Sequence, residues 1–275
     1  IFNNCGINNE MLKVLGDALT DTSLTLQIKG LDLSNNNIRN HQGIDELCPF
    51  FEKSMTLEIL DLSRNDIDPI GGIAIFNSFT RRAQQQTQTK IKSIDLSYNL
   101  INRLSTTLTT STSNNENENH NKLFGIYGFL SRNTSLQQLN LSGNKMNDTS
   151  IELICNGLKV AGTTSNLQRL CLGFNHIGDR GAIAIGSLLF TNNVSSLQYI
   201  ELNENNIGND GGMAILNGMG GGGGGSGDSG GNGDGTNNVH HNLKEIKGLW
   251  DNNINRRYII VSIRKLLLLN THEND

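Results

Sequence analysis

One pattern of apolar residues and asparagine returns along most of this sequence and limits what the chain can fold into. The stretch "LQRLCLGFNHI" contains Leu170, Leu172, Asn175 and Ile177, and "LQYIELNENNI" repeats these residue types at the same offsets. The pattern occurs in six full copies, and a seventh copy has one extra residue, Gly248. The asparagine position is filled by Cys5, Asn36, Asn65, Asn99, Asn144, Asn175, Asn205 and Asn252. A period of about 30 residues indicates stacked repeats, because one unit cannot bury its apolar face alone.

Each copy predicts one short strand followed by one helix. Leucines at alternate positions put one face of the strand into a core, and small or apolar residues recur at helical spacing over 178–189. Parallel strands lie about 4.8 Å apart, whereas packed helices need about 8–10 Å, so the strands must line the inside of an arc. The sequence therefore predicts an α/β solenoid, a horseshoe with a parallel sheet on the concave face and helices on the convex face.

The asparagine position has a structural explanation. The chain leaves the strand there, and its turn would bury backbone groups that have no sheet partner, at about 1–3 kcal/mol for each unpaired group. An asparagine side chain has two donors and one acceptor, so it can bond the turns of adjacent repeats. We therefore expect a ladder of buried asparagines, with Cys5 as a small buried substitute at its edge.

The repeats resemble those of leucine-rich repeat proteins. Their length and the helices in "IGDRGAIAIGSLLFTN" and "IGNDGGMAILNGM" are similar to the ribonuclease-inhibitor-like class. That class includes the C-terminal repeats of NOD-like receptors and the Ran GTPase-activating proteins. The resemblance implies a non-catalytic module that binds a partner protein through its concave face. A GTPase regulator and a ligand-sensing receptor domain remain alternatives, and no motif specific to either is matched, so no functional residue is carried over.

The chain is expected to form a single domain, 1–275, of about eight repeats with a truncated first repeat. Low-complexity inserts at about 81–90, 104–121 and 217–242 interrupt the period, and their composition predicts disordered loops. The tail from Asn255 is expected to form the last helix and to cover the end of the array. The truncated first repeat and the missing initiator Met suggest a piece of a longer protein.

Composition excludes several other classes of function. The 22 basic and 26 acidic residues give a net charge of −4, which argues against a general nucleic-acid surface. No apolar run reaches the length of a membrane span, and the chain shows no signal peptide, which favours the cytoplasm. The four cysteines have no metal-ligand spacing, and the glycine-rich segment lacks the lysine of a phosphate loop. We expect no cofactor, no metal, no membrane partner and no catalytic group.

Outward-facing positions of the strands form columns that could bind a partner. The central column begins with Asp32, Asp61 and Asp95, which could attract a partner with a basic surface or could be a common solvated form of the repeat. Aromatic residues on an exposed sheet are typical binding anchors. For Trp250, an inward orientation caused by Gly248 is an alternative. The predicted protein-binding residues are Asp32, Asp61, Asp95, Tyr98, Phe174, Tyr199, Glu201, Glu204 and Trp250.

Overall fold

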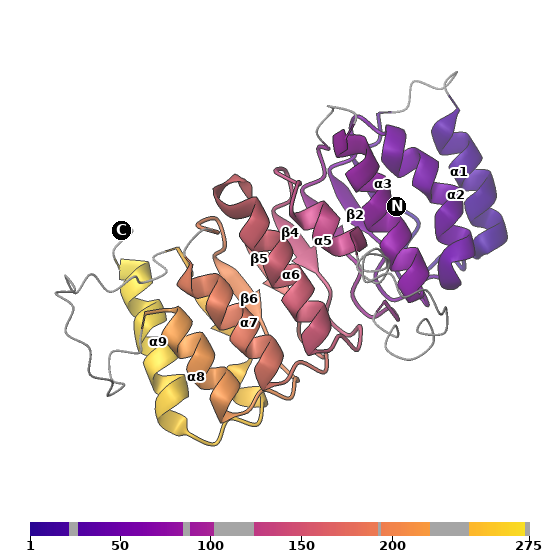
Figure 1. Cartoon of the computed structure of the whole chain (residues 1–275). Helices are drawn as coiled ribbons and strands as arrows, with labels where there is room; N and C mark the ends of the chain where they lie inside the picture. Colours follow the sequence, from indigo (N-terminus) through magenta and orange to yellow (C-terminus); the bar gives the residue numbers. More distant parts are fainter. Residues whose placement is uncertain (22–26, 85–88, 102–123, 192–193, 221–241, 273–275) are drawn as a thin grey trace, which may run out of the picture.

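A computed structural model describes residues 1–21, 27–84, 89–101, 124–191, 194–220 and 242–272. Strands and helices alternate along these residues, and the helices form one layer in front of one sheet (Figure 1). The strands are β1 (Gly30–Asp32), β2 (Ile59–Asp61), β3 (Ser93–Asp95), β4 (Gln138–Asn140), β5 (Arg169–Cys171), β6 (Tyr199–Glu201) and β7 (Glu245–Lys247). The α-helices are α1 (Asn9–Thr20), α2 (Asn40–Lys53), α3 (Pro69–Gln84), α5 (Phe124–Leu130), α6 (Asp148–Ala161), α7 (Asp179–Phe190), α8 (Asn209–Gly218) and α9 (Arg257–His272). Two short 3-10 helices, η1 (Gly162–Thr164) and η2 (Leu249–Asp251), follow α6 and β7.

The seven strands form one open parallel sheet in sequence order, β1 to β7. Equivalent positions of neighbouring repeats lie opposite each other, so Asp32 pairs with Asp61, and Asp61 pairs with Asp95. The same register continues to the pair of Glu201 and Lys247. The predicted α/β leucine-rich-repeat solenoid and the predicted columns of outward residues are confirmed.

The core lies between the sheet and the helices. The middle residue of every strand is buried, and so is the leucine that follows most strands, such as Leu33, Leu62 and Leu172. On the helix side, the Phe51 and Phe79 rings stack with centroids 5.4 Å apart, and Phe129 packs against Phe76 at 5.5 Å. One continuous apolar cluster therefore runs through all the repeats, so each repeat depends on its neighbours for burial.

The asparagine ladder has the bonding that its position predicts. Asn144 is fully buried, and its Nδ2 donates to Leu141 O of its own repeat at 3.2 Å and to Leu96 O of the preceding repeat at 2.8 Å. Its Oδ1 accepts from the backbone N–H of Ile101 at 3.2 Å. Asn65 and Asn175 make the same kinds of bonds at their levels. These side chains therefore join each turn to the turn of the repeat before it.

The expectation for Cys5 was wrong in one respect. Cys5 does occupy the ladder position of the repeat before Asn36, and its backbone N–H donates to Asn36 Oδ1 at 3.0 Å. Its side chain is exposed rather than buried. The described residues place no further repeat against the other side of Cys5, so its side chain has nothing to pack on.

Two of the predicted disordered inserts are partly ordered. Helix α3 extends through 81–84, and Thr89 is buried, with its hydroxyl accepting from Asn133 Nδ2 at 2.8 Å. Helix α8 extends to Gly218, and Met219 is buried. The low-complexity composition predicted disorder over the whole of each insert. It did not show that the first and last residues of these inserts belong to helices and to the core. The remainder, 85–88 and 221–241, and all of the insert at 104–121 lie outside the described residues.

A second ladder joins the N-terminal ends of the helices, and the sequence analysis missed it. Asp148 starts α6 and accepts the N–H of Gly178, just before α7, at 2.6 Å. Asp179 starts α7 and accepts the N–H of Gly208 at 2.6 Å. Asn209 starts α8 and accepts the N–H of Asn255 at 3.0 Å. A carboxylate or amide at a helix N-terminus also satisfies helix donors that lack a partner. The signal was an Asp or Asn four residues after the ladder asparagine.

We predict that Asn144→Leu lowers the free energy of unfolding by about 1–3 kcal/mol, because leucine leaves buried carbonyl and N–H groups without partners. Urea denaturation followed by circular dichroism measures the change. A denaturation curve that matches the parent would contradict the structural role given to the ladder.

Close packing of neighbouring helices predicts a second effect. A Cβ atom on Gly186 of α7 would overlap the carbonyl oxygen of Ala214 in α8. Gly186→Ala should therefore lower the free energy of unfolding by about 1–3 kcal/mol. Gly128 of α5 is the matched control, because the nearest atom to its added Cβ, Arg132 Nη1, is 3.5 Å away. Gly128→Ala should leave stability unchanged or raise it by about 0.5–1 kcal/mol, since alanine favours a helix. Equal effects of the two substitutions in urea denaturation would disprove this explanation.

Candidate binding face

The carboxylates of the central column close the turns that follow their own strands. Asp32 Oδ1 accepts from the N–H and the hydroxyl of Ser34, at 3.1 Å and 2.6 Å. Asp95 Oδ1 accepts from Ser97 in the same way, at 2.8 Å and 2.6 Å, and Asp61 Oδ1 accepts the N–H of Ser63 at 2.9 Å. These are Asx-type turns, in which a carboxylate fixes the backbone two residues later. The column therefore has a structural role that does not depend on a partner.

Burial and mutual repulsion both act on this column. Burial is the main cause that raises the pKa of Asp61, and the like charges of Asp95 and Asp32 add to it. The hydrogen bonds from Ser63 oppose the rise. The column ends at Asn140, whose Nδ2 donates to Asp95 Oδ2 at 2.8 Å. An uncharged amide thus follows three adjacent carboxylates.

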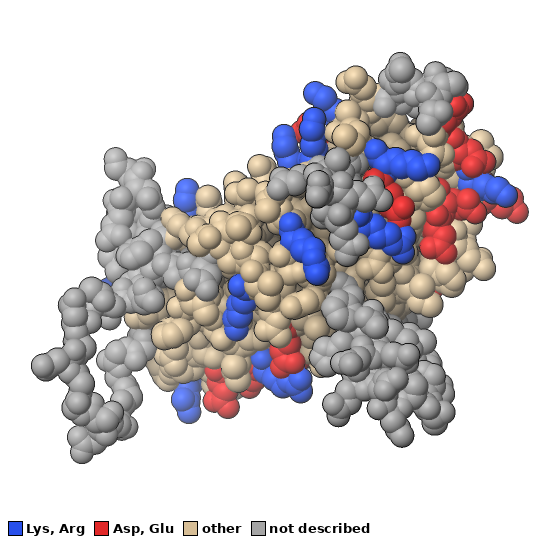
Figure 2. Space-filling model, turned by 45° about the horizontal axis from the view of Figure 1, so that its top comes forward, with Lys and Arg blue, Asp and Glu red and all other residues tan. Residues whose placement is uncertain are grey.

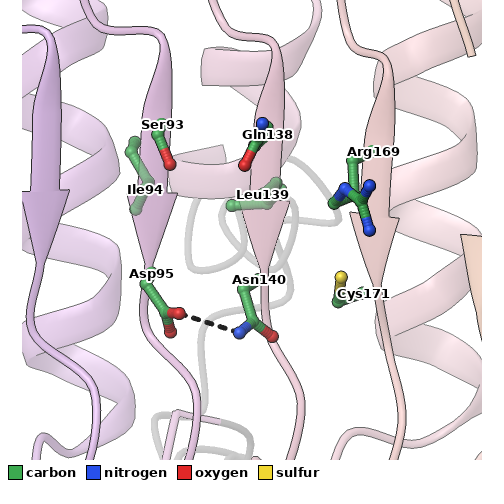
Figure 3. Close-up of a pocket in the computed structure, with 8 residues that line it drawn as sticks. All are labelled: Ser93, Ile94, Asp95, Gln138, Leu139, Asn140, Arg169 and Cys171. Atoms are coloured by element: carbon green, nitrogen blue, oxygen red, sulfur yellow. Dashed lines mark hydrogen bonds between the residues drawn. The ribbon is translucent and has the colours of Figure 1, made fainter. Parts of the chain in front are cut away.

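A shallow hollow of about 110 Å³ lies on the outward face of β3, β4 and β5 (Figure 3). Ser93, Gln138 and Arg169 line its upper row, and Asp95, Asn140 and Cys171 line the row below. Burial, and after it the nearby carboxylate of Glu201, raises the pKa of the Cys171 thiol to about 12. Cys171 therefore stays protonated at neutral pH and is a poor nucleophile. The hollow is lined mainly by polar side chains, and it offers no activated nucleophile.

The residue before each ladder asparagine forms a second feature, which we call the rim. Arg64, Tyr98, Phe174 and Glu204 have φ between 53° and 55°, and Gly143 has φ of 68°. The N–H groups of all of these except Glu204 extend the sheet pairing: for example, Tyr98 donates to Ser142 O at 2.7 Å and Phe174 to Asn203 O at 2.8 Å. The rim residues therefore point outward because of this left-handed turn, and not through strand alternation as predicted for Phe174 and Glu204.

Two rim aromatics form a joined surface, the aromatic platform, made of Tyr98, Gly143 and Phe174. The two rings lie with centroids 6.2 Å apart, and they are 41% and 47% exposed. Gly143 lies in the turn after β4, in the repeat between them, and a Cβ atom there would come within 2.6 Å of Tyr98 Cδ1. The Arg64 guanidinium lies over the Tyr98 ring, 4.6 Å from its centroid. Glycine at 143 thus permits two bulky rings to meet across an intervening repeat.

The other predicted site residues are separate from the platform. Tyr199 starts β6, and the Arg169 guanidinium lies 4.1 Å from the centroid of its ring. Burial, together with the charges of Glu201 and Glu245, raises the pKa of Tyr199 to about 12. Glu201 lies 3.9 Å from the Lys247 ammonium. Trp250 is half exposed, so it does not adopt the inward orientation that Gly248 could have caused. Its ring packs under Arg264 of α9 at 4.6 Å, and the neighbouring Leu249 fills the core instead.

A group of acidic side chains on the helical side was not singled out from the sequence. Helices α1 and α2 carry Glu10, Asp17, Asp45, Glu46 and Glu52. Figure 2 shows acidic atoms gathered at the end of the molecule that these two helices form. This group belongs to different elements from the platform, because it lies on helices rather than on the sheet.

Within the residues that the structure describes, no three His, Cys, Asp or Glu side chains gather as metal ligands would. Nor does any helix of the described chain combine the length and apolarity that a bilayer crossing requires. The four cysteines are free thiols. Burial raises the pKa of Cys48 to about 11 and that of Cys155 to about 12.

Comparison with known proteins agrees with the fold. The family model "Leucine Rich repeat" matches residues 53–76, 132–155, 164–186 and 195–216. Ribonuclease inhibitor from Sus scrofa is 27% identical over 174 residues, which cover 63% of this chain and 32% of that protein. The matched part therefore spans about a third of that relative's length.

Among solved structures, the chain is similar to Leiomodin-1 Actin-Binding Site 2, with 16% identity and a TM-score of 0.47 over 73% of this chain and 91% of that one. An internalin from Listeria monocytogenes is 15% identical with a TM-score of 0.26 over 94% of this chain and 92% of that one. The repeats, the open parallel sheet and the inhibitor relative together define a repeat module of the leucine-rich type. The chain carries leucine-rich repeats, and its similarity to ribonuclease inhibitor supports a leucine-rich repeat protein of the ribonuclease-inhibitor-like class.

The raised pKa of Asp61 predicts a pH-dependent effect of Asp61→Asn. The charged Asp61 carboxylate is less favourable in the folded chain than in the unfolded chain. Its charge therefore lowers the free energy of unfolding at any pH above its folded pKa. This destabilisation disappears as the pH falls through that pKa, because the carboxyl group becomes protonated. At pH 7 the variant should equal or exceed the parent by a few tenths of a kcal/mol, and the difference should vanish in acid. Urea denaturation at both pH values measures it.

Asn140→Asp is the matched control, because it extends the run of carboxylates and removes the bond to Asp95. It should destabilise at pH 7. A clear loss of stability in Asp61→Asn at pH 7 would show that the Asp61 charge itself is required.

Proposed function

We propose that this chain binds a partner protein through the concave face and its rim, with the aromatic platform as the anchor, and that it catalyses no reaction itself. The observation that supports the proposal is the exposed pair of Tyr98 and Phe174. Left-handed backbone is unfavourable for residues other than glycine by about 1–2 kcal/mol, so asparagine or glycine would suit these positions better. Burial does not compensate, because both rings remain almost half exposed.

The surroundings of the platform fit protein recognition. Aromatic and arginine side chains dominate the energetics of protein interfaces, and Arg64, Tyr98 and Phe174 supply both kinds in one row. The hydrogen-bonded rim holds the backbone under the rings, so little order has to be gained on binding. The hollow beside Asp95 lies on the two repeats that carry these aromatic residues and on the repeat between them, and it adds a place for a partner's polar side chain.

The remaining site residues have secondary places in this proposal. Tyr199, Glu201, Glu204 and Trp250 extend the binding face toward the last repeats, and Asp32, Asp61 and Asp95 extend it toward the first.

We also propose a single repeat domain over 1–275 and a cytoplasmic location, where the free thiols would stay reduced. No observation in the described residues favours a GTPase-regulating role or a receptor role over simple partner binding.

Removal of both rings is predicted to abolish partner capture. The full chain and its Tyr98→Ala/Phe174→Ala variant are immobilised and exposed to cell extract, and captured proteins are quantified by mass spectrometry. Proteins held by the parent should be lost from the variant, because truncating an anchor of this kind costs about 2 kcal/mol or more.

Phe190→Ala is the matched control, since Phe190 is also an exposed phenylalanine but lies at the end of α7. It should capture the same proteins as the parent. If the double variant keeps those partners while its denaturation curve stays that of the parent, the binding surface lies elsewhere.

A further inference from the structure

The aromatic rings on the sheet side differ in how they are covered. Arg64 lies over Tyr98 at 4.6 Å, Arg169 over Tyr199 at 4.1 Å, and Arg264 over Trp250 at 4.6 Å. Phe174 is the exception in the described part of the chain: its ring contact is with Tyr98, and no guanidinium lies over it. Its 47% exposure leaves room for one.

An acidic residue, Glu204, occupies the rim position one repeat after this uncovered ring. Phe174 donates its N–H to Asn203 O, the residue before Glu204, at 2.8 Å. Glu204 has the same left-handed backbone as Phe174 and the same rim position, one repeat further on. Side chains at equivalent positions of adjacent parallel strands are separated by about 5 Å. Glu204 is exposed and forms no ion pair with another described residue.

We propose that Phe174 and Glu204 together bind an arginine side chain of the partner protein. This inference rests on the proposed function, since it names the chemistry that the same face recognises. A planar guanidinium can stack on the phenyl ring and at the same time donate two hydrogen bonds to a carboxylate, which an ammonium cannot match. The chain already places a guanidinium over the rings of Tyr98, Tyr199 and Trp250.

The charges along the rim also fix the direction of binding. Arg64 occupies the Tyr98 end of the platform, so a second cation there would be repelled. The Glu204 end is acidic, and Asp251 follows in the next repeat. A partner segment therefore lies with its arginine toward the C-terminal repeats and with uncharged or acidic residues toward Arg64.

The test uses short random peptides displayed on phage and selected on the full chain, with the Tyr98→Ala/Phe174→Ala variant as counter-selection. Selected peptides are then synthesised with arginine and with citrulline, which has a similar shape but no charge. Their affinities are measured for the parent and for Glu204→Gln, with Glu10→Gln on α1 as the matched control. The denaturation curve of each variant is checked first.

We expect the selected peptides to contain arginine. Either citrulline or Glu204→Gln should weaken binding about tenfold or more, and the two changes together should weaken it little further, because they remove the same contact. Glu10→Gln should have no effect. Lysine in place of arginine should also lose affinity.

Two results would overturn the proposal, and they differ in what else they disprove. Peptides that need the platform but keep their affinity with citrulline or with Glu204→Gln would disprove the arginine site and leave the proposed function intact. A selection that gives no peptide dependent on Tyr98 and Phe174 would disprove both.

Discussion

The bond between an asparagine amide and the backbone of the neighbouring repeat is the interaction on which the rest of this structure depends. The strands have only three residues each, and one such strand has too few backbone bonds to hold its register. Asn144 and its counterparts add donors and an acceptor where the sheet ends, and they join each turn to the turn before it. Because the turn is fixed, the residue just before the asparagine takes a left-handed backbone and presents its side chain outward. The rim is thus a consequence of the ladder.

The sequence was sufficient to predict the solenoid, and it was less informative about its surface. Leucine alternation and the asparagine period predicted the strands, the register and the ladder, because these features recur in every repeat and depend on burial. The second ladder through Asp148, Asp179 and Asn209 was visible as a spacing but was missed, since a polar residue at the start of a helix looks like an ordinary cap. The ordered ends of the inserts were missed because composition does not show that Thr89 and Met219 reach the core.

The binding face shows where spacing alone is insufficient. Tyr98 and Phe174 belong to non-adjacent repeats, and their contact depends on the small residue Gly143 in the repeat between them. The sequence predicted Trp250 and Tyr199 as binding residues on the same grounds as Phe174. In the structure Tyr199 packs with Arg169 and Trp250 packs with Arg264, away from the platform. The sequence predicted the column Asp32, Asp61 and Asp95 as an interaction site, and it did not reveal that these carboxylates also close the serine turns after their strands. Side-chain neighbours across repeats determine these outcomes, and one sequence does not specify them.

The binding proposal requires a rigid rim, and the asparagine ladder is what would make the rim rigid. Native-state hydrogen exchange of the rim's backbone amides measures this rigidity directly. The N–H groups of Tyr98, Gly143 and Phe174 donate to Ser142 O, Gly173 O and Asn203 O at 2.7, 2.9 and 2.8 Å. If the ladder holds the platform in one conformation, these amides will exchange nearly as slowly as those of Leu141 and Leu172 in the adjoining core. Exchange at the rate of an exposed loop, with the core leucines still protected, would show a mobile rim and contradict a preformed platform.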